Sequence, residues 1–120
     1  MAVPVILVVD DEPDVRELAA LALTDAGHAV LTAQDGAEAL ELVERKPDIA
    51  LIFTDLVMPR MDGIELGAMA RARRPHIKIL YATGYVNLAN AQADALHGPI
   101  LGKPYRPSQL EAEVKALLQA

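Results

Sequence analysis

The chain has 120 residues with a formal net charge of −6, and hydrophobic residue types make up 52% of it. This length and composition suffice for one compact core, so we expect a single domain over residues 1–120. The absence of cysteine excludes disulfides, thiolate zinc sites and thiol nucleophiles and fits a reducing cytoplasm, while the acidic balance argues against direct nucleic-acid binding.

An apolar run near the N-terminus ends at Asp10, far short of the ~20 residues that a membrane span needs. We therefore expect neither a signal peptide nor membrane insertion. Residues 5–9 are the first of five short apolar runs that predict strands, and the others are residues 29–32, 49–53, 77–81 and 100–101. Because these runs lack polar alternation, they favour a parallel sheet that is covered on both faces.

The intervening segments have helical periodicity. The first helix is predicted to begin near Pro13 and to end at Gly27. Its inner face is predicted to consist of Val15, Leu18, Ala19, Ala22 and Leu23. The second helix follows Asp35-Gly36 and stops before Pro47, whose ring disfavours helix at the preceding residue.

Three further helices are predicted. The third covers about residues 63–74, and its terminal arginines, Arg71, Arg73 and Arg74, are expected to be solvated. Residues 87–97 are polar and alanine-rich, which indicates a short, loosely held fourth helix, and the last helix starts at Pro107. Alternation of five strands with five helices predicts an open, doubly wound α/β domain.

Ligands of such sheets bind beyond the carboxyl ends of the strands, and polar residues follow four of the predicted strands. They are Asp10-Asp11, Asp55, Thr83-Gly84 and Lys103-Pro104. Converging carboxylates repel one another unless a cation lies among them, and oxygen ligands suit Mg²⁺. Aspartate can attack phosphorus, and a lysine and a threonine hydroxyl can contact phosphoryl oxygens. We therefore predict a Mg²⁺-dependent, phosphoryl-accepting site at Asp55.

Each motif alone has a simpler explanation. The acidic pair could be a solvated helix start, Asp55 could cap a turn, and the other two pairs could lie in ordinary turns or loops. Jointly, the motifs resemble the receiver domains of two-component response regulators over essentially the whole chain. The matching segments are Val8-Val9-Asp10-Asp11-Glu12-Pro13, Thr54-Asp55-Leu56-Val57-Met58-Pro59 with Asp62-Gly63, Ala82-Thr83-Gly84 and Gly102-Lys103-Pro104.

This resemblance implies a flavodoxin-like strand order 2-1-3-4-5, a cis Lys103-Pro104 bond and a signalling role rather than that of an enzyme. It implies a set of Mg²⁺ ligands, namely the side chains of Asp10, Asp11 and Asp55 and the backbone carbonyl of Val57. Asp55 would be the phosphoacceptor, Thr83 the switch hydroxyl and Lys103 the phosphate contact. The donor would be a histidine kinase or a histidine phosphotransfer protein. With no output domain expected after the last helix, the target would be another protein.

The switch departs from the usual family pattern, because Ile100 stands where receivers usually carry Tyr or Phe, three residues before the lysine. The run from Tyr81 to Tyr85 resembles a receiver subgroup with a Phe-Ala-Thr-Gly-Tyr signature, in which the aromatic residue follows the threonine. Tyr85 is therefore our candidate for a relocated switch residue.

Other functions are conceivable on this architecture. A haloacid dehalogenase type phosphatase would need a second acid two residues after Asp55, where Val57 stands. A flavin or nucleotide carrier would need a Gly-, Ser- or Thr-rich loop after the first strand, where Asp-Asp-Glu stands. A module that signals by binding without phosphorylation fits the fold but leaves the acidic site unexplained.

Overall fold

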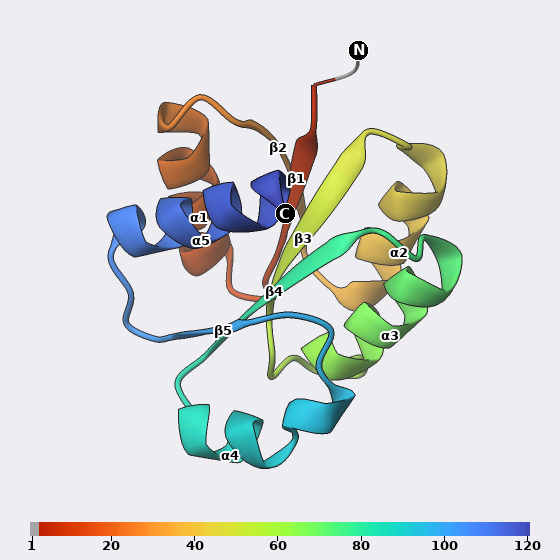
Figure 1. Cartoon of the computed structure of the whole chain (residues 1–120), viewed down its shortest axis with the longest axis vertical. Helices are drawn as coiled ribbons and strands as arrows, with labels where there is room; N and C mark the ends of the chain where they lie inside the picture. The colour runs from red at the N-terminus through yellow and green to blue at the C-terminus, as the bar shows by residue number, and fades with distance from the viewer. Residues whose placement is uncertain (1–2) are drawn as a thin grey trace.

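The computed structural model describes residues 3–120, with every side chain in this range except that of Leu88. Within it, five parallel strands form one sheet (Figure 1): β1 (Val5–Val9), β2 (Ala29–Ala33), β3 (Ile49–Asp55), β4 (Lys78–Thr83) and β5 (Ile100–Gly102). Their order is β2-β1-β3-β4-β5, which confirms the predicted topology. Ligand chemistry is therefore expected where β1, β3 and β4 end side by side.

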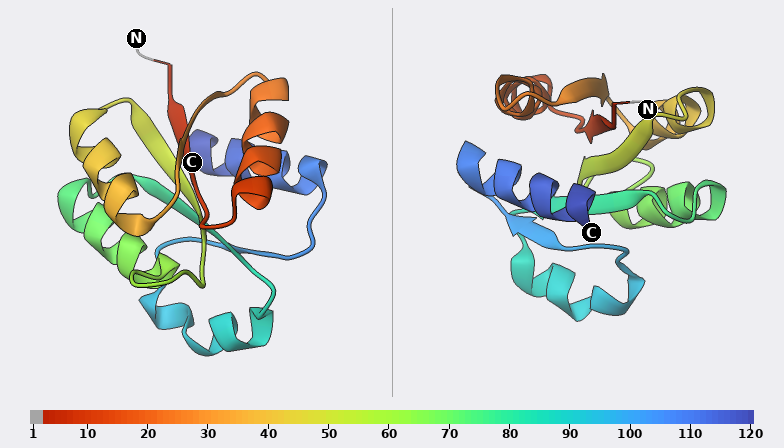
Figure 2. Two further views of the ribbon diagram at one scale, coloured as in Figure 1. Left: turned by 180° about the vertical axis from the view of Figure 1, so that it is seen from behind. Right: turned by 45° about the horizontal axis from the view of Figure 1, so that its top comes forward.

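The described helices are α1 (Pro13–Asp25), α2 (Gly36–Arg45), α3 (Gly63–Arg73), α4 (Val86–Ala91) and α5 (Pro107–Gln119), with a 3₁₀ turn at Ala93–Ala95. Figure 2 shows α1 and α5 on one face of the sheet and α2 and α3 on the other, with α4 beside β5. None of these helices is long and apolar enough to cross a membrane. The fourth helix is short, as predicted, and Ala89 is the only buried one among its described side chains.

The central strand β1 shows why its sequence is uniformly apolar. Leu7 and Val9 point into the core between the sheet and the α2 and α3 layer, whereas Ile6 and Val8 point into the core beneath α1 and α5. Successive strand residues face opposite sides of a sheet, so a strand covered on both sides needs apolar residues at every position. The prediction of a doubly covered parallel sheet is thus confirmed.

The predicted inner face of α1 is wrong at Leu18, which is 68% exposed. The helix packs on the sheet through Ala19 and Leu23, which are buried and four residues apart on one helix face. Leu18 precedes Ala19 by one residue, about 100° around the helix, and so lines a groove that α1 forms with Tyr105 and Pro107.

The arginine cluster at the C-terminal end of α3 is also not simply solvated. The Nε of Arg71 donates to the Ile77 carbonyl at 2.6 Å, and its Nη2 donates to the His97 carbonyl at 3.2 Å. The Nη1 of Arg74 donates to the carbonyls of Val43 and Lys46 at 3.3 and 3.2 Å. These arginines donate to backbone carbonyls outside α3, and so they tie α3 to its neighbours.

Candidate functional site

The polar residues predicted at the strand ends meet at one edge of the sheet. Sheet registers pair Val9 with Thr54 and Asp55 with Ala82, so the residue after β1 and the last residue of β3 lie at nearly the same level. Asp10, Asp11 and Asp55 each offer a carboxylate oxygen, and these oxygens lie within 4.8 Å of one another. The structure therefore brings together the three side chains proposed from the sequence as metal ligands.

Asp10 is the most enclosed of the three and is only 5% exposed. Its Oδ1 accepts a hydrogen bond from the Glu12 N–H at 2.9 Å, and its Oδ2 lies 3.6 Å from the Nζ of Lys103. The same Nζ lies 3.3 Å from Oδ1 of Asp55. Lys103 follows β5, and its peptide bond to Pro104 is cis, as expected. One ammonium group thus contacts two carboxylates from two other strands.

This single ammonium does not neutralise three carboxylates. Desolvation raises the pKa of Asp55; the Lys103 charge opposes the shift, and Asp10 and Asp11 add to it. Burial, together with the charges of Asp10 and Asp55, raises the pKa of Tyr105 to about 12. The field at this edge is therefore negative. A hard divalent cation with oxygen ligands fits both the donor set and the excess charge, and Mg²⁺ has these preferences.

Val57 lies two residues beyond Asp55 in the turn after β3, and its side chain is exposed. The position two residues after Asp55 therefore carries no second acid. Gly63, at the start of α3, closes this turn because its N–H donates to the Leu56 carbonyl at 2.8 Å.

Thr83, at the end of β4, is buried, and its Oγ1 accepts a hydrogen bond from the Tyr85 N–H at 3.0 Å. A hydroxyl can accept one bond and still donate its own hydrogen, so Thr83 can serve both Tyr85 and an incoming oxygen. The Tyr85 side chain is 63% exposed, whereas Ile100 is half-buried and packs against the core. The three proposed switch residues therefore lie at different depths, and Thr83 contacts the backbone of Tyr85.

Sequence reasoning missed two neighbours of the site. The Nη1 of Arg16 donates to the Asp10 carbonyl at 2.8 Å. Tyr105 packs edge-on against Phe53 with ring centroids 5.8 Å apart. Tyr105 lies two residues after Lys103, so its position in the sequence could have indicated that it lies near the site. The arginine gives no signal in the sequence, because its partner is a backbone carbonyl.

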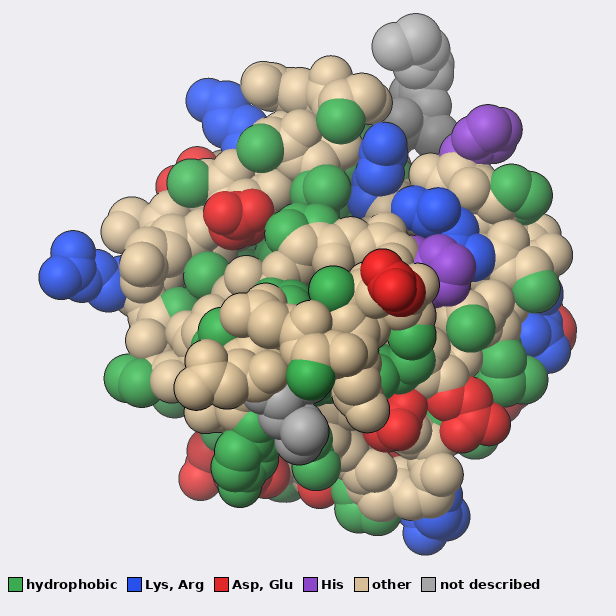
Figure 3. Space-filling view, turned by 60° about the horizontal axis from the view of Figure 1, so that its bottom comes forward, with side chains coloured by type: hydrophobic (Ala, Val, Ile, Leu, Met, Phe, Trp, Pro, Cys, Tyr) green, Lys and Arg blue, Asp and Glu red, His purple; other side chains and the backbone are tan. Residues whose placement is uncertain are grey.

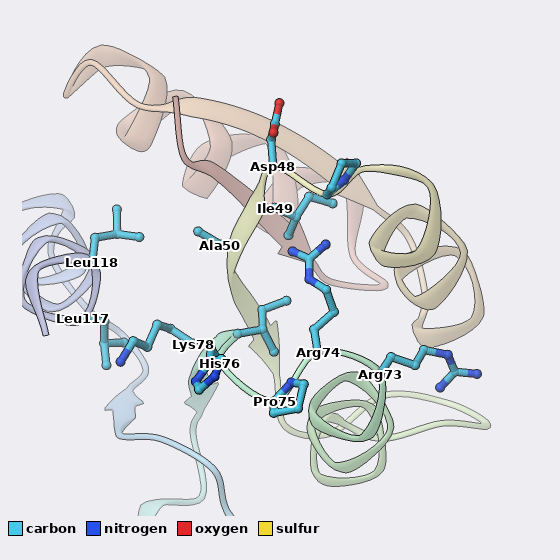
Figure 4. A pocket seen from close by; sticks show the side chains of 12 residues that line it. Asp48, Ile49, Ala50, Arg73, Arg74, Pro75, His76, Lys78, Leu117 and Leu118 are labelled. Atoms are coloured by element: carbon cyan, nitrogen blue, oxygen red, sulfur yellow. The ribbon is translucent and has the colours of Figure 1, made fainter. Parts of the chain in front are cut away.

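The opposite edge of the sheet has a different character. A hollow of about 450 Å³ lies there between the ends of α2, α3 and α5 (Figure 4). In that view Arg74 extends toward Asp48, while Arg73 points away and forms an ion pair with Glu44 at 2.6 Å. Figure 3, with the α4 end turned forward, shows acidic and basic groups on several sides of this face and histidines toward the right. The arginines at this edge already have partners, so the reactive arrangement is the carboxylate cluster.

Comparison with known proteins gives a consistent picture. The family model described as the response regulator receiver domain matches residues 6–115. The response regulator receiver protein CpdR of Brucella abortus is 38% identical, with 96% of this chain and 97% of that protein covered. The sensor kinase CckA of the same organism is also 38% identical, but the match covers 95% of this chain and only 12% of the kinase.

Solved structures show the same similarity. The chemotaxis protein CheY4 of Vibrio cholerae superimposes with a TM-score of 0.86 at 28% identity, over 97% of this chain and 99% of that one. The receiver domain of the hybrid histidine kinase CckA gives a TM-score of 0.82 at 34% identity, over 96% and 99% of the two chains. Similar domains therefore occur both as nearly whole proteins and as small parts of long ones.

Proposed function

The chain belongs to the response regulator receiver family, and on that premise we propose that it is one phosphoryl-accepting domain over residues 1–120. Asp55 would take the phosphoryl group from a histidine kinase or a histidine phosphotransfer protein. The observation that carries the proposal is the half-buried cluster in which Asp55 lies beside Asp10, Asp11 and Lys103. We place the chain in the cytoplasm, in keeping with its lack of cysteine.

In the proposed reaction, a carboxylate oxygen of Asp55 attacks phosphorus, and the bond from phosphorus to the imidazole nitrogen of the donor breaks. The imidazole leaves with that electron pair and takes up a proton, and an acyl phosphate remains on Asp55. The ammonium of Lys103, already 3.3 Å from the Asp55 carboxylate, is placed to balance charge on the phosphoryl oxygens.

Asp10, Asp11, Asp55 and the carbonyl of Val57 would hold Mg²⁺, which supplies neutralising charge to the phosphoryl oxygens. The remaining groups act through their own contacts. The buried Asp10 is held by the Glu12 N–H, so its carboxylate is already oriented before a cation arrives. The Thr83 hydroxyl is free to donate to a phosphoryl oxygen, because it acts as an acceptor in its bond with Tyr85.

A protein donor needs an apolar surface to dock on beside this charged site. A groove of about 550 Å³ adjoins Lys103 and is lined by α1 side chains, including the exposed Leu18, together with Tyr105 and Pro107. A contiguous apolar groove beside a charged edge is typical of surfaces that bind other proteins. We assign this groove to the phosphoryl donor.

The output would be a shift between two arrangements of the segment after β4. Donation by Thr83 to the phosphoryl group would shift the hydroxyl oxygen that also accepts from the Tyr85 N–H, so phosphorylation would move the backbone of Tyr85. We propose that Tyr85, with Ile100 in the usual aromatic position, carries this change to a downstream protein. The domain then signals by changing a binding surface and is not an enzyme for external substrates.

The test is incubation with Mg²⁺ and a small acyl phosphate, followed by intact-mass analysis. The wild type should gain one phosphoryl group and Asp55→Asn should gain none, while Asp48→Asn, an exposed aspartate at the opposite edge, should react like the wild type. Chelation of the metal should suppress labelling. Equal labelling of Asp55→Asn would refute the assignment, and no labelling of the wild type would favour a module that signals by binding alone.

A further inference from the structure

Arg16, in the first turns of α1, is bonded twice to the turn that precedes it. Its backbone N–H donates to the Glu12 carbonyl at 3.0 Å, and its Nη1 donates to the Asp10 carbonyl at 2.8 Å. The side chain is half-buried. Both ends of the residue therefore hold the β1–α1 turn, which carries two of the three carboxylates of the site.

The other polar groups of Asp10 already have partners. Its N–H donates to the Ala33 carbonyl at 3.3 Å, one carboxylate oxygen accepts from Glu12, and the other pairs with Lys103. The carbonyl of Asp10, one residue after β1, accepts no backbone hydrogen bond from residues 3–120, and Arg16 satisfies it with a charge-assisted bond. Asp10 is thus fixed by contacts from β2, from its own turn, from β5 and from α1.

The bond from Arg16 to the Asp10 carbonyl also affects Asp11. A peptide group is planar, so the Asp10 carbonyl and the Asp11 N–H lie in one rigid plane. Asp11 is exposed, and among the hydrogen bonds of residues 3–120 none involves its backbone or its side chain. The bond from the Glu12 N–H to the Asp10 carboxylate closes the turn around Asp11, and the bond from Arg16 acts directly on the peptide plane from which Asp11 projects.

Arg16 binds a backbone carbonyl although carboxylates lie near it in the sequence. Arg16 has five acidic neighbours in the chain, namely Asp10, Asp11, Glu12, Asp14 and Glu17, yet within the described part of the chain it forms no ion pair. Its guanidinium is directed at backbone instead. We propose that Arg16 is a positioning residue of the Mg²⁺ site, which holds the Asp10–Asp11 peptide so that both carboxylates face Asp55. This inference rests on the proposed function and adds a specific part to it.

Electrostatics alone predicts the opposite effect of removing Arg16. A cation beside a Mg²⁺ site repels the metal, so loss of its charge should tighten binding. Loss of a group that orients the ligands should weaken binding, typically by ten- to a hundredfold for groups that support metal ligands. Arg16→Met removes both the charge and the bond, and Arg16→Lys keeps the charge but loses the planar fork.

The experiment is a Mg²⁺ titration of the metal-free proteins, followed by the backbone amide NMR signals of residues 10, 11 and 55. We expect Arg16→Met and Arg16→Lys to raise the Kd about tenfold. Arg73→Met removes a charge and an ion pair at the opposite edge and should leave the Kd unchanged. Thermal unfolding without metal identifies any variant whose weaker binding reflects unfolding.

The outcomes separate the two proposals. A wild type whose amide signals at these residues do not respond to Mg²⁺ would contradict the proposed function. A wild type that binds, with Arg16 variants that bind equally well or more tightly, would overturn the positioning role alone. A folded Arg16→Met variant that binds about tenfold more weakly, against the electrostatic expectation, would establish it.

Discussion

The two sides of the site are held to different degrees. On the β1 and β3 side, Asp10 is 5% exposed and bonded through every polar group, and Asp55 ends a strand with neighbours on both sides. On the β4 and β5 side, Thr83 is followed by the exposed Tyr85 and by the short α4, in which only Ala89 is buried among the described side chains.

The weakly buried stretch that follows Thr83 has a defined far end. The His97 N–H donates to the buried Tyr81 hydroxyl at 3.1 Å, and Arg71 donates to the His97 carbonyl. Residues 84–96 thus run between two fixed points with few buried contacts, as expected of segments that open at low cost in free energy. The carboxylates Asp10 and Asp55, which must be preorganised, lie on the rigid side, and the proposed signal passes through the segment after β4.

The largest expected effect that tests this contrast comes from replacing one glycine by alanine on each side of the site. A Cβ at Gly63 would lie 2.9 Å from the Leu56 Cα and 2.5 Å from the Asp55 carbonyl oxygen, whereas one at Gly84 would meet nothing within 4 Å. We expect Gly63→Ala to lower the free energy of unfolding by about 1–3 kcal/mol and Gly84→Ala to change it by less than about 0.5 kcal/mol.

Urea unfolding of both variants beside the wild type measures this difference. The obstacle at Gly63 is backbone, which cannot rotate away as a side chain would, so the cost falls on the turn that carries Asp55. Equal destabilisation by the two substitutions would show that the β4–α4 turn is as tightly packed as the turn after β3, and the contrast would fail.

A smaller effect on the free energy of unfolding comes from the charge of Asp55 on the rigid side in the absence of metal. Burial raises the pKa of Asp55 in the folded chain, so between the unfolded and folded pKa values the folded state binds more protons than the unfolded state. The free energy of unfolding therefore falls as pH rises through that window. Asp55→Asn avoids this cost, and without metal it should be more stable than the wild type at pH 7.

The advantage should disappear below about pH 4, where Asp55 is protonated in both states. Thermal unfolding from pH 3 to pH 8, with Asp48→Asn as the exposed control, measures it. A lower stability of Asp55→Asn at pH 7 would mean that the ion pair with Lys103 outweighs desolvation and repulsion at this carboxylate.

The fold could be predicted because its determinants are local. Asp35 and Asp62 cap α2 and α3 by accepting the N–H groups of Glu38 and Glu65, and residues of these types in these places mark helix starts. The uninterrupted apolar runs require a sheet buried on both faces, and parallel strand ends bring their polar residues to one edge. Asp10 and Asp55 were therefore within reach of sequence reasoning.

What escaped prediction depends on long-range geometry. Whether Leu18 is buried depends on the orientation of α1 about its own axis on the sheet. The helical periodicity does not fix this orientation, so the predicted buried face included Leu18, which is exposed. Arg71 and Arg74 reach carbonyls of other elements, and Arg16 reaches a carbonyl at a strand end. Every residue has a backbone carbonyl, so the sequence does not reveal which carbonyl an arginine will bind. The arginine side chains alone therefore suggested only solvent exposure.

The smallest effect on stability, and the most direct test of the second side, concerns Tyr85. Because its side chain is 63% exposed, Tyr85→Ala should change the free energy of unfolding by less than about 0.5 kcal/mol. Ile100→Val, in the half-buried position, should cost about 0.5–1.5 kcal/mol. If Tyr85 carries the switch, phosphorylation should alter amide hydrogen exchange over residues 84–96 in the wild type and in Ile100→Val, and this response should be largely lost in Tyr85→Ala. Loss of this response in Ile100→Val alone would show that Ile100 in β5 carries the switch and that Tyr85 has no role in it.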